Sequence, residues 1–65
     1  MIAVRSSVIS AIGYDSENSV LYVKFKSGML YKYHRVPEYV FKDFLNARSK
    51  GSFFSLRIRD EYRVS

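Results

Sequence analysis

The sequence predicts an α+β fold, in which a three-stranded antiparallel β-meander carries one or two C-terminal helices packed on one face. Three observations lead to this prediction. Residues 20–26 alternate between apolar and polar side chains, as a half-buried strand does. Turn-forming residues separate this segment from its neighbours on both sides. After Pro37 the apolar residues change to a helical spacing. The chain has 65 residues without a linker or repeat, so we expect one domain.

The first two strands are expected at 8–15 and 20–26. The segment VISAIGYD at 8–15 is apolar and partly β-branched, and the turn-rich DSENS at 15–19 follows it. In the second strand the apolar side chains at alternate positions share one face, and these are Leu21, Val23 and Phe25.

The turn before a third strand at 29–36 decides which side chains share a face. A two-residue turn of Ser27-Gly28 suits neither a type I′ nor a type II′ hairpin. A three-residue loop of Lys26-Ser27-Gly28 instead places the glycine at the left-handed position of a G1 bulge. The two-residue alternative would bring Lys32 and His34 onto the apolar face and bury charge. We therefore predict the bulge, with a core-facing set of Leu21, Val23, Phe25, Met29, Tyr31 and Tyr33.

The same register predicts a second face that is open to water, as antiparallel sheets allow. It displays Tyr22, Lys24, Leu30, Lys32 and His34. The Tyr-x-Tyr pair at 31 and 33 is then expected to pack under the helices, with its hydroxyls at the rim. Stacking of these two rings on exposed bases is the alternative.

A helix is expected to begin at Pro37, which suits the first helical position, with Glu38 complementing the helix dipole. Through the segment PEYVFKDFLNAR its apolar stripe consists of Val40, Phe41, Phe44 and Leu45. Ser49 either ends this helix or caps the next one. Residues 50–59 form a short second helix or a final strand, because FFSLRIR also partly alternates.

The motifs IGYD, LYVKFKSG, YKY, VP and ARSKGSFF…IR, taken in this order, resemble the KTSC domain. The resemblance covers nearly the whole chain, from Val4 to Tyr62, and the family's Tyr-x-Tyr matches Tyr31 and Tyr33. The family is named for its place at the C-terminus of some lysyl-tRNA synthetases, and it also occurs as free-standing small bacterial and phage-type proteins. The resemblance therefore implies a single KTSC-like domain over 1–65 and, through its association with a tRNA synthetase, RNA binding.

Positive charge is concentrated in two segments of this chain, whose net charge is +5. Residues 21–36 contain four Lys and Arg and no acid, and residues 48–65 contain five against Asp60 and Glu61. Such clustering is typical of proteins that bind a polyanion.

Two sets of candidate nucleic-acid-binding residues follow from this pattern. On the expected open face, Tyr22, Lys24, Lys32 and His34 combine an aromatic ring with cations, as single-strand RNA binders do. A solvated face with edge-protecting lysines is the alternative. In the C-terminal half, RSKGS offers backbone N–H groups for phosphate near a helix start. The basic residues of this second set are Arg48, Lys50, Arg57, Arg59 and Arg63, although RIRDEYR would also suit a helix with its own ion pairs.

Other functional classes are disfavoured. The chain has no cysteine, and His34 is its only histidine, so we expect no metal site and no cofactor. No nucleophile is spaced with a base, so we expect no catalytic residues and no enzyme activity. Without a long apolar segment, we expect a cytoplasmic protein that does not enter a membrane. The alternative to an RNA or single-stranded nucleic-acid partner is a protein partner or self-association, through exposed sheet edges and Tyr22, Leu30 or Phe53.

Overall fold

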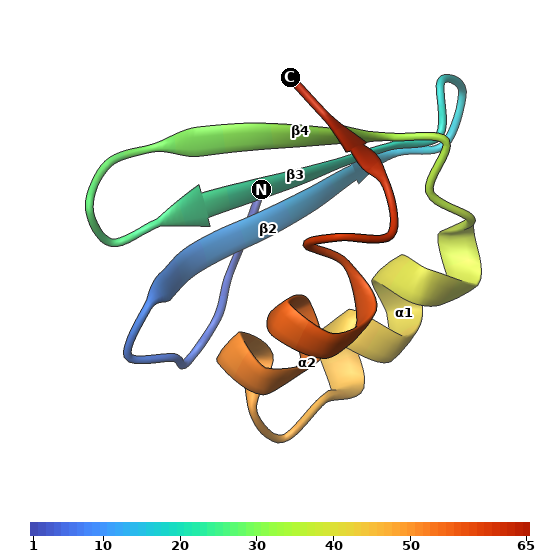
Figure 1. The fold of residues 1–65 in the computed structure, drawn as a ribbon. Coiled ribbons are helices and arrows are strands. Elements are labelled where there is room, and N and C mark those ends of the chain that lie inside the picture. Colours follow the sequence, from blue (N-terminus) through green and yellow to red (C-terminus); the bar gives the residue numbers. More distant parts are fainter.

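A five-stranded antiparallel sheet with both helices on one face forms the molecule, in a computed structural model that describes residues 1–65 (Figure 1). The strands lie in sequence order, and they are β1 (Ile2–Ala3), β2 (Ile9–Asp15), β3 (Val20–Phe25), β4 (Leu30–His34) and β5 (Arg63–Val64). Helices α1 (Glu38–Asn46) and α2 (Lys50–Arg57) connect β4 to β5. Neither helix is long and apolar enough to cross a membrane.

The α+β class is confirmed, but the prediction of three strands is wrong. The expected meander is present as β2-β3-β4, and two strands of two residues each extend it, β1 beside β2 and β5 beside β4. Strands this short carry no alternating pattern that a sequence could reveal. They form because the outer strands of a meander present unpaired backbone N–H and C=O groups.

The hairpin between β3 and β4 has the predicted register. Val23 pairs with Tyr31 and Leu21 with Tyr33. The amide of Gly28 donates to the Phe25 carbonyl at 2.9 Å, and Gly28 has a φ of +99°. The loop is therefore Lys26-Ser27-Gly28, with glycine in the left-handed conformation of the bulge.

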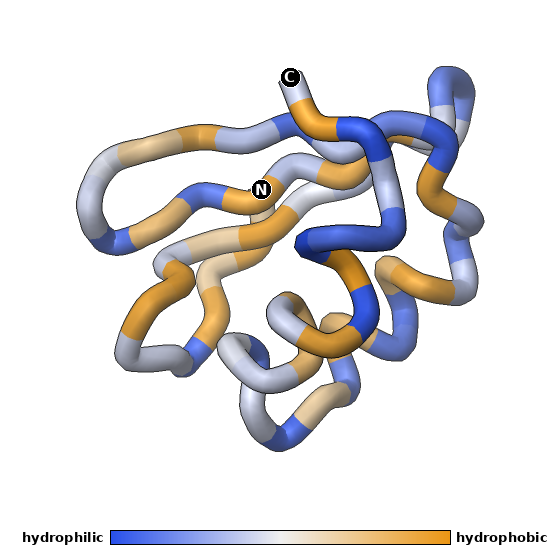
Figure 2. Tube along the Cα trace, viewed as in Figure 1, coloured by the Kyte–Doolittle hydropathy of each residue, from blue (hydrophilic) through white to orange (hydrophobic).

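The core lies between the inner sheet face and the helices. Tyr33 is 3% exposed, and its ring meets Phe54 of α2 edge to face at 5.6 Å. Tyr31 is half-buried and meets Phe25 edge to face at 5.4 Å. Met29 departs from the expected core, because it is 53% exposed where the hairpin extends past the helices. In Figure 2 the strands carry hydrophobic stretches, whereas the loop at 15–19 is hydrophilic.

The C-terminal half resolves the alternatives at Ser49. The Ser49 side chain accepts a hydrogen bond from the Ser52 amide at 3.2 Å, so it caps α2, and a final strand over 50–59 is excluded. Pro37 is the N-cap of α1 rather than its first residue, so the helix begins at Glu38, one residue later than predicted. The two helices are held together by stacked rings of Phe44 and Phe53, 5.2 Å apart.

Candidate functional site

The sheet face opposite the helices carries four of the predicted side chains together. We call this surface the open face and define it by Tyr22, Lys24, Lys32 and His34 of β3 and β4. Tyr22 and Lys32 are directly paired across the two strands, and the Lys32 Nζ lies 6.0 Å from the centroid of the Tyr22 ring. The two lysines are exposed, while Tyr22 and His34 are half-buried. The open face thus presents two ammonium groups beside one phenol ring.

Next to Tyr22 the face changes from basic to small and apolar. Gly13 of β2 pairs with Tyr22, and Ala11 pairs with Lys24. Gly13 is buried beneath Met1, and a Cβ on this glycine would lie 3.1 Å from the Met1 Cγ. Tyr22 therefore stands at the boundary between an uncharged half, formed by β1 and β2, and a basic half.

The acidic residue Asp15 lies at the C-terminal end of β2. Asp15 is the last residue of the strand and accepts hydrogen bonds from the side chain and backbone of Asn18. The side-chain bond from Asn18 is the main reason that the pKa of Asp15 is lowered. The carboxylate is thus occupied by its own turn.

On the other side, β5 completes the basic half. The Ser65 amide donates to the Lys32 carbonyl at 2.9 Å, and the Ser65 Oγ lies 2.7 Å from the His34 Nε2. Arg63 pairs with His34, so it belongs to the same end of the sheet.

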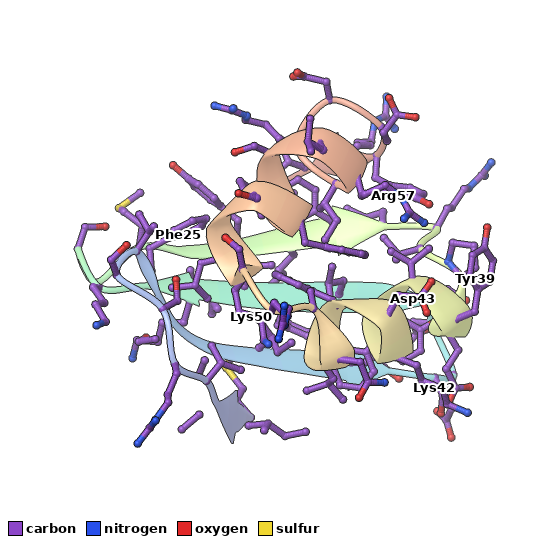
Figure 3. The ribbon with its side chains drawn as sticks, turned by 90° about the horizontal axis from the view of Figure 1, so that it is seen from below. Phe25, Tyr39, Lys42, Asp43, Lys50 and Arg57 are labelled. Carbon is purple, nitrogen blue, oxygen red and sulfur yellow. The ribbon has the colours of Figure 1, made fainter.

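Apart from Arg63 on β5, the second predicted basic set lies on the helix layer and does not join the open face. Arg48 is exposed in the loop between the helices, where the Lys50 Nζ donates to the Ala47 carbonyl. Figure 3 shows Arg57 of α2 near Asp43 of α1, with a nitrogen–oxygen distance of 4.0 Å.

Arg57 also lies over the ring of Phe53, with its guanidinium carbon 5.0 Å from the ring centroid. Arg59 is exposed in the turn after α2. The predicted residues therefore form two separate groups, and the guanidinium of Arg57 already has partners within the chain.

A groove that was not predicted from the sequence lies where β4 ends beside β5. Its lining consists of His34, Arg35, Glu61, Tyr62, Arg63 and Ser65. Burial raises the pKa of the Tyr62 phenol. Apart from His34 and Arg63, these residues were not candidates, because their proximity depends on the pairing of β4 with the two-residue strand β5.

Arg35 reaches the surface through an unusual backbone conformation. Strict alternation after Tyr33 would point Arg35 toward the core. Its φ of +57° breaks the alternation, so that Val36 is fully buried and Arg35 is exposed. The Tyr14 hydroxyl donates to the Val36 carbonyl at 2.6 Å, and the Val36 amide donates to Ser19 at 2.9 Å.

No group of three or more His, Cys, Asp or Glu side chains gathers anywhere in the chain. The ion pairs join Lys42 to Glu38 and Arg57 to Asp43, both at 4.0 Å. The open face and the groove therefore offer unpaired cations, hydroxyls and one imidazole, together with the carboxylate of Glu61 in the groove.

The chain is similar to several known proteins. A protein of Tsukamurella paurometabola is 40% identical over 61 residues, which are 94% of this chain and 91% of that protein. A lysine–tRNA ligase of Nostoc punctiforme is 36% identical over 59 residues, which span 91% of this chain but only 10% of the ligase. The crystal structure of a KTSC domain protein from Yersinia pestis covers 97% of this chain with a TM-score of 0.94 and 38% identity, and the match spans 89% of that structure. The KTSC domain model matches residues 5–62, and the chain belongs to the KTSC domain family.

Proposed function

We propose that this domain binds RNA or single-stranded nucleic acid through the open face, without catalysing a reaction. The observation that carries the proposal is the pairing of Lys32 with Tyr22, beside exposed Lys24, on a sheet face that no helix covers. No acid occurs in residues 21–36, which include both of these strands.

The open face offers two kinds of contact. The ammonium groups of Lys24 and Lys32 neutralise backbone phosphates, which is the main source of affinity for nucleic acids. The ring of Tyr22 offers a surface on which one base stacks, a contact worth about 1–3 kcal/mol. Gly13 of β2 pairs with Tyr22 and is covered by Met1, so the base contacts the Tyr22 ring rather than the backbone of β2. Tyr31 and Tyr33 have no part in this contact, since both pack on the helix side of the sheet.

The relatives support the proposal indirectly. A segment of this family lies within proteins named lysine–tRNA ligase, whose name states that they act on tRNA. Arg48, Lys50 and Arg59 lie on the helix layer. They would contact the same nucleic acid only if it extended from the open face around the edge of the domain.

A salt titration tests the proposal. Fluorescence anisotropy of a labelled single-stranded RNA of about ten nucleotides is measured between roughly 50 and 300 mM salt. If about 3–5 phosphates are contacted, log K falls with log salt at a slope of about −2 to −3.5. Replacing both Lys24 and Lys32 with alanine is expected to reduce the magnitude of this slope by about 1.4, since each single-strand phosphate contributes about 0.7.

The matched control is Lys42→Ala, which removes an exposed lysine from the helix layer. It is expected to leave the slope unchanged. Absence of binding at low salt, or equal slopes for the double variant and the control, would refute the proposal.

A second candidate function is strand addition by a partner protein or by another copy of the chain. It is favoured by one observation: β5 pairs with β4 only as far as Lys32, and beyond it Leu30 is 44% exposed, with β3 on one side and no strand on the other. Light scattering distinguishes this case. A dimer that dissociates in a Leu30→Glu variant supports strand addition, and a monomer at all concentrations argues against self-association.

A further inference from the structure

We propose that the groove between the end of β4 and β5 is a binding site for a phosphate monoester. The phosphate site itself is inferred from the groove alone. Its assignment to the terminal phosphate of a nucleic-acid strand rests in addition on the proposed function. The residues that line the groove are His34, Arg35, Glu61, Tyr62, Arg63 and Ser65.

Two arginines without a carboxylate partner face this groove. Arg63 lies opposite His34 in the β4–β5 pair, and Arg35 directly follows His34 in the chain. Neither forms an ion pair, although Glu61 also lines the groove. A guanidinium presents several N–H donors in a plane that matches two oxygens of a phosphate, so two of them from adjacent segments suit a dianion.

The backbone conformation of Arg35 suggests that the arginine side chain has a role beyond turning the chain between β4 and α1. A left-handed conformation at a residue with a Cβ costs about 1–2 kcal/mol, which glycine or asparagine largely avoids. Either of these residues would redirect the chain so that Val36 enters the core. The surrounding contacts hold the strained conformation, through the bonds of Val36 to Tyr14 and to Ser19. Arginine at this position adds a fixed cation to the groove.

The remaining polar groups of the groove complete the set of donors. The Ser65 Oγ and the His34 Nε2 lie 2.7 Å apart as a hydrogen-bonded pair, so one proton lies between them and a second proton of the pair remains for a phosphate oxygen. The Tyr62 phenol lies in the same lining. The groove is open on one side, which allows the phosphate to remain attached to a larger molecule.

The groove is also continuous with the open face. His34 belongs to both, and Lys32 is bonded to Ser65 through the backbone. A strand that lies along Lys24 and Lys32 would therefore reach the groove with its end. This continuity is the reason for assigning the phosphate to a strand terminus rather than to an internal position.

Amide chemical-shift titration tests the phosphate site independently of RNA. Inorganic phosphate is added at constant ionic strength, with chloride as the reference salt. We expect the largest shifts at His34, Arg35 and Arg63, and we expect them to be lost in Arg35→Asn and in Arg63→Gln. Asparagine is chosen because it tolerates a positive φ. The control is Arg5→Gln, an exposed arginine outside the groove. Shifts spread over all the lysines, or shifts that persist in both groove variants, would overturn the site.

Three further ligands test the carrier of the phosphate. An RNA of about ten nucleotides with a terminal phosphate is expected to bind roughly tenfold tighter than the same RNA ending in hydroxyls, and Arg35→Asn removes the difference. Equal affinities of the two RNAs would overturn the strand-end assignment. A mononucleotide that binds as tightly as the phosphorylated RNA would also overturn it, in favour of a free nucleotide. If inorganic phosphate shifts the groove but no RNA binds, the phosphate site stands and the proposed function fails.

Discussion

Replacing Tyr14 with phenylalanine is expected to destabilise this domain by about 1–3 kcal/mol, although the substitution removes a single oxygen atom. Tyr14 lies on the core side of β2, where its ring stacks on Phe41 of α1 with centroids 5.3 Å apart. Its hydroxyl donates to the Val36 carbonyl at 2.6 Å, across the connection between β4 and α1. Phenylalanine keeps the stacking and removes only the hydrogen bond.

The magnitude follows from the burial of the acceptor. An average hydrogen bond contributes about 0.5–1.5 kcal/mol, but a buried group that loses its partner costs about 1–3 kcal/mol. Val36 has no exposed surface, so water cannot readily replace the lost donor. In a domain this small, each kcal/mol lowers Tm by about 4–8 °C. A core of this size supplies only about 3–5 kcal/mol in total, so the variant would lose a large part of its stability.

Urea denaturation followed by circular dichroism measures this loss. The control is Tyr39→Phe, because Tyr39 is 62% exposed and makes no hydrogen bond, and its stability is expected to stay within about 0.5 kcal/mol of the parent. If Tyr14→Phe unfolds at the same urea concentration as Tyr39→Phe, then the bond to Val36 does not hold the β4–α1 connection as we infer.

Four further predictions concern local stability and pH. Ser49→Ala removes the N-cap of α2 and should lower the free energy of unfolding, measured by urea denaturation, by about 1 kcal/mol, whereas Ser49→Asp should retain most of the parent stability. Gly28→Ala should lower Tm by the equivalent of about 1 kcal/mol or more, because φ is +99° there even though the added methyl meets no atom within 4 Å. Asp15 has a lowered pKa, so its stabilising contribution is present at neutral pH and is lost as pH falls below 3.8. Tyr33 has a pKa raised by burial, so stability should fall as pH rises above 10, and urea denaturation of Tyr33→Phe should show a smaller alkaline loss.

The register of the central hairpin was predictable because one residue determines it. Gly28 favours the left-handed conformation, and the alternative loop would have buried Lys32 and His34. The structure shows the predicted pairing of Val23 with Tyr31. The sequence therefore correctly predicted which side chains share the open face, since strand residues alternate between the two faces once the register is known.

The edges of the sheet were not predictable in the same way. Strand β5 has two residues, and it is positioned by its pairing with Tyr33 and His34 rather than by a pattern of its own. The groove that β5 forms was missed with it. Arg35 was assigned to the third strand, because a positive φ at an arginine has no signal in the sequence. For residues 50–57, the helical and alternating patterns overlapped, and the cap at Ser49 decided between them.

The order of the strands has a consequence for how the domain assembles. Strands β1 to β4 are neighbours in the chain as well as in the sheet, so each pair can close as a local hairpin. Strand β5 is separated from β4 by both helices in the chain, so its pairing with β4 is a long-range contact. We expect its amides to exchange with solvent earliest among the strands, and the arginine-lined groove to appear last during folding and to vanish first when the chain begins to open.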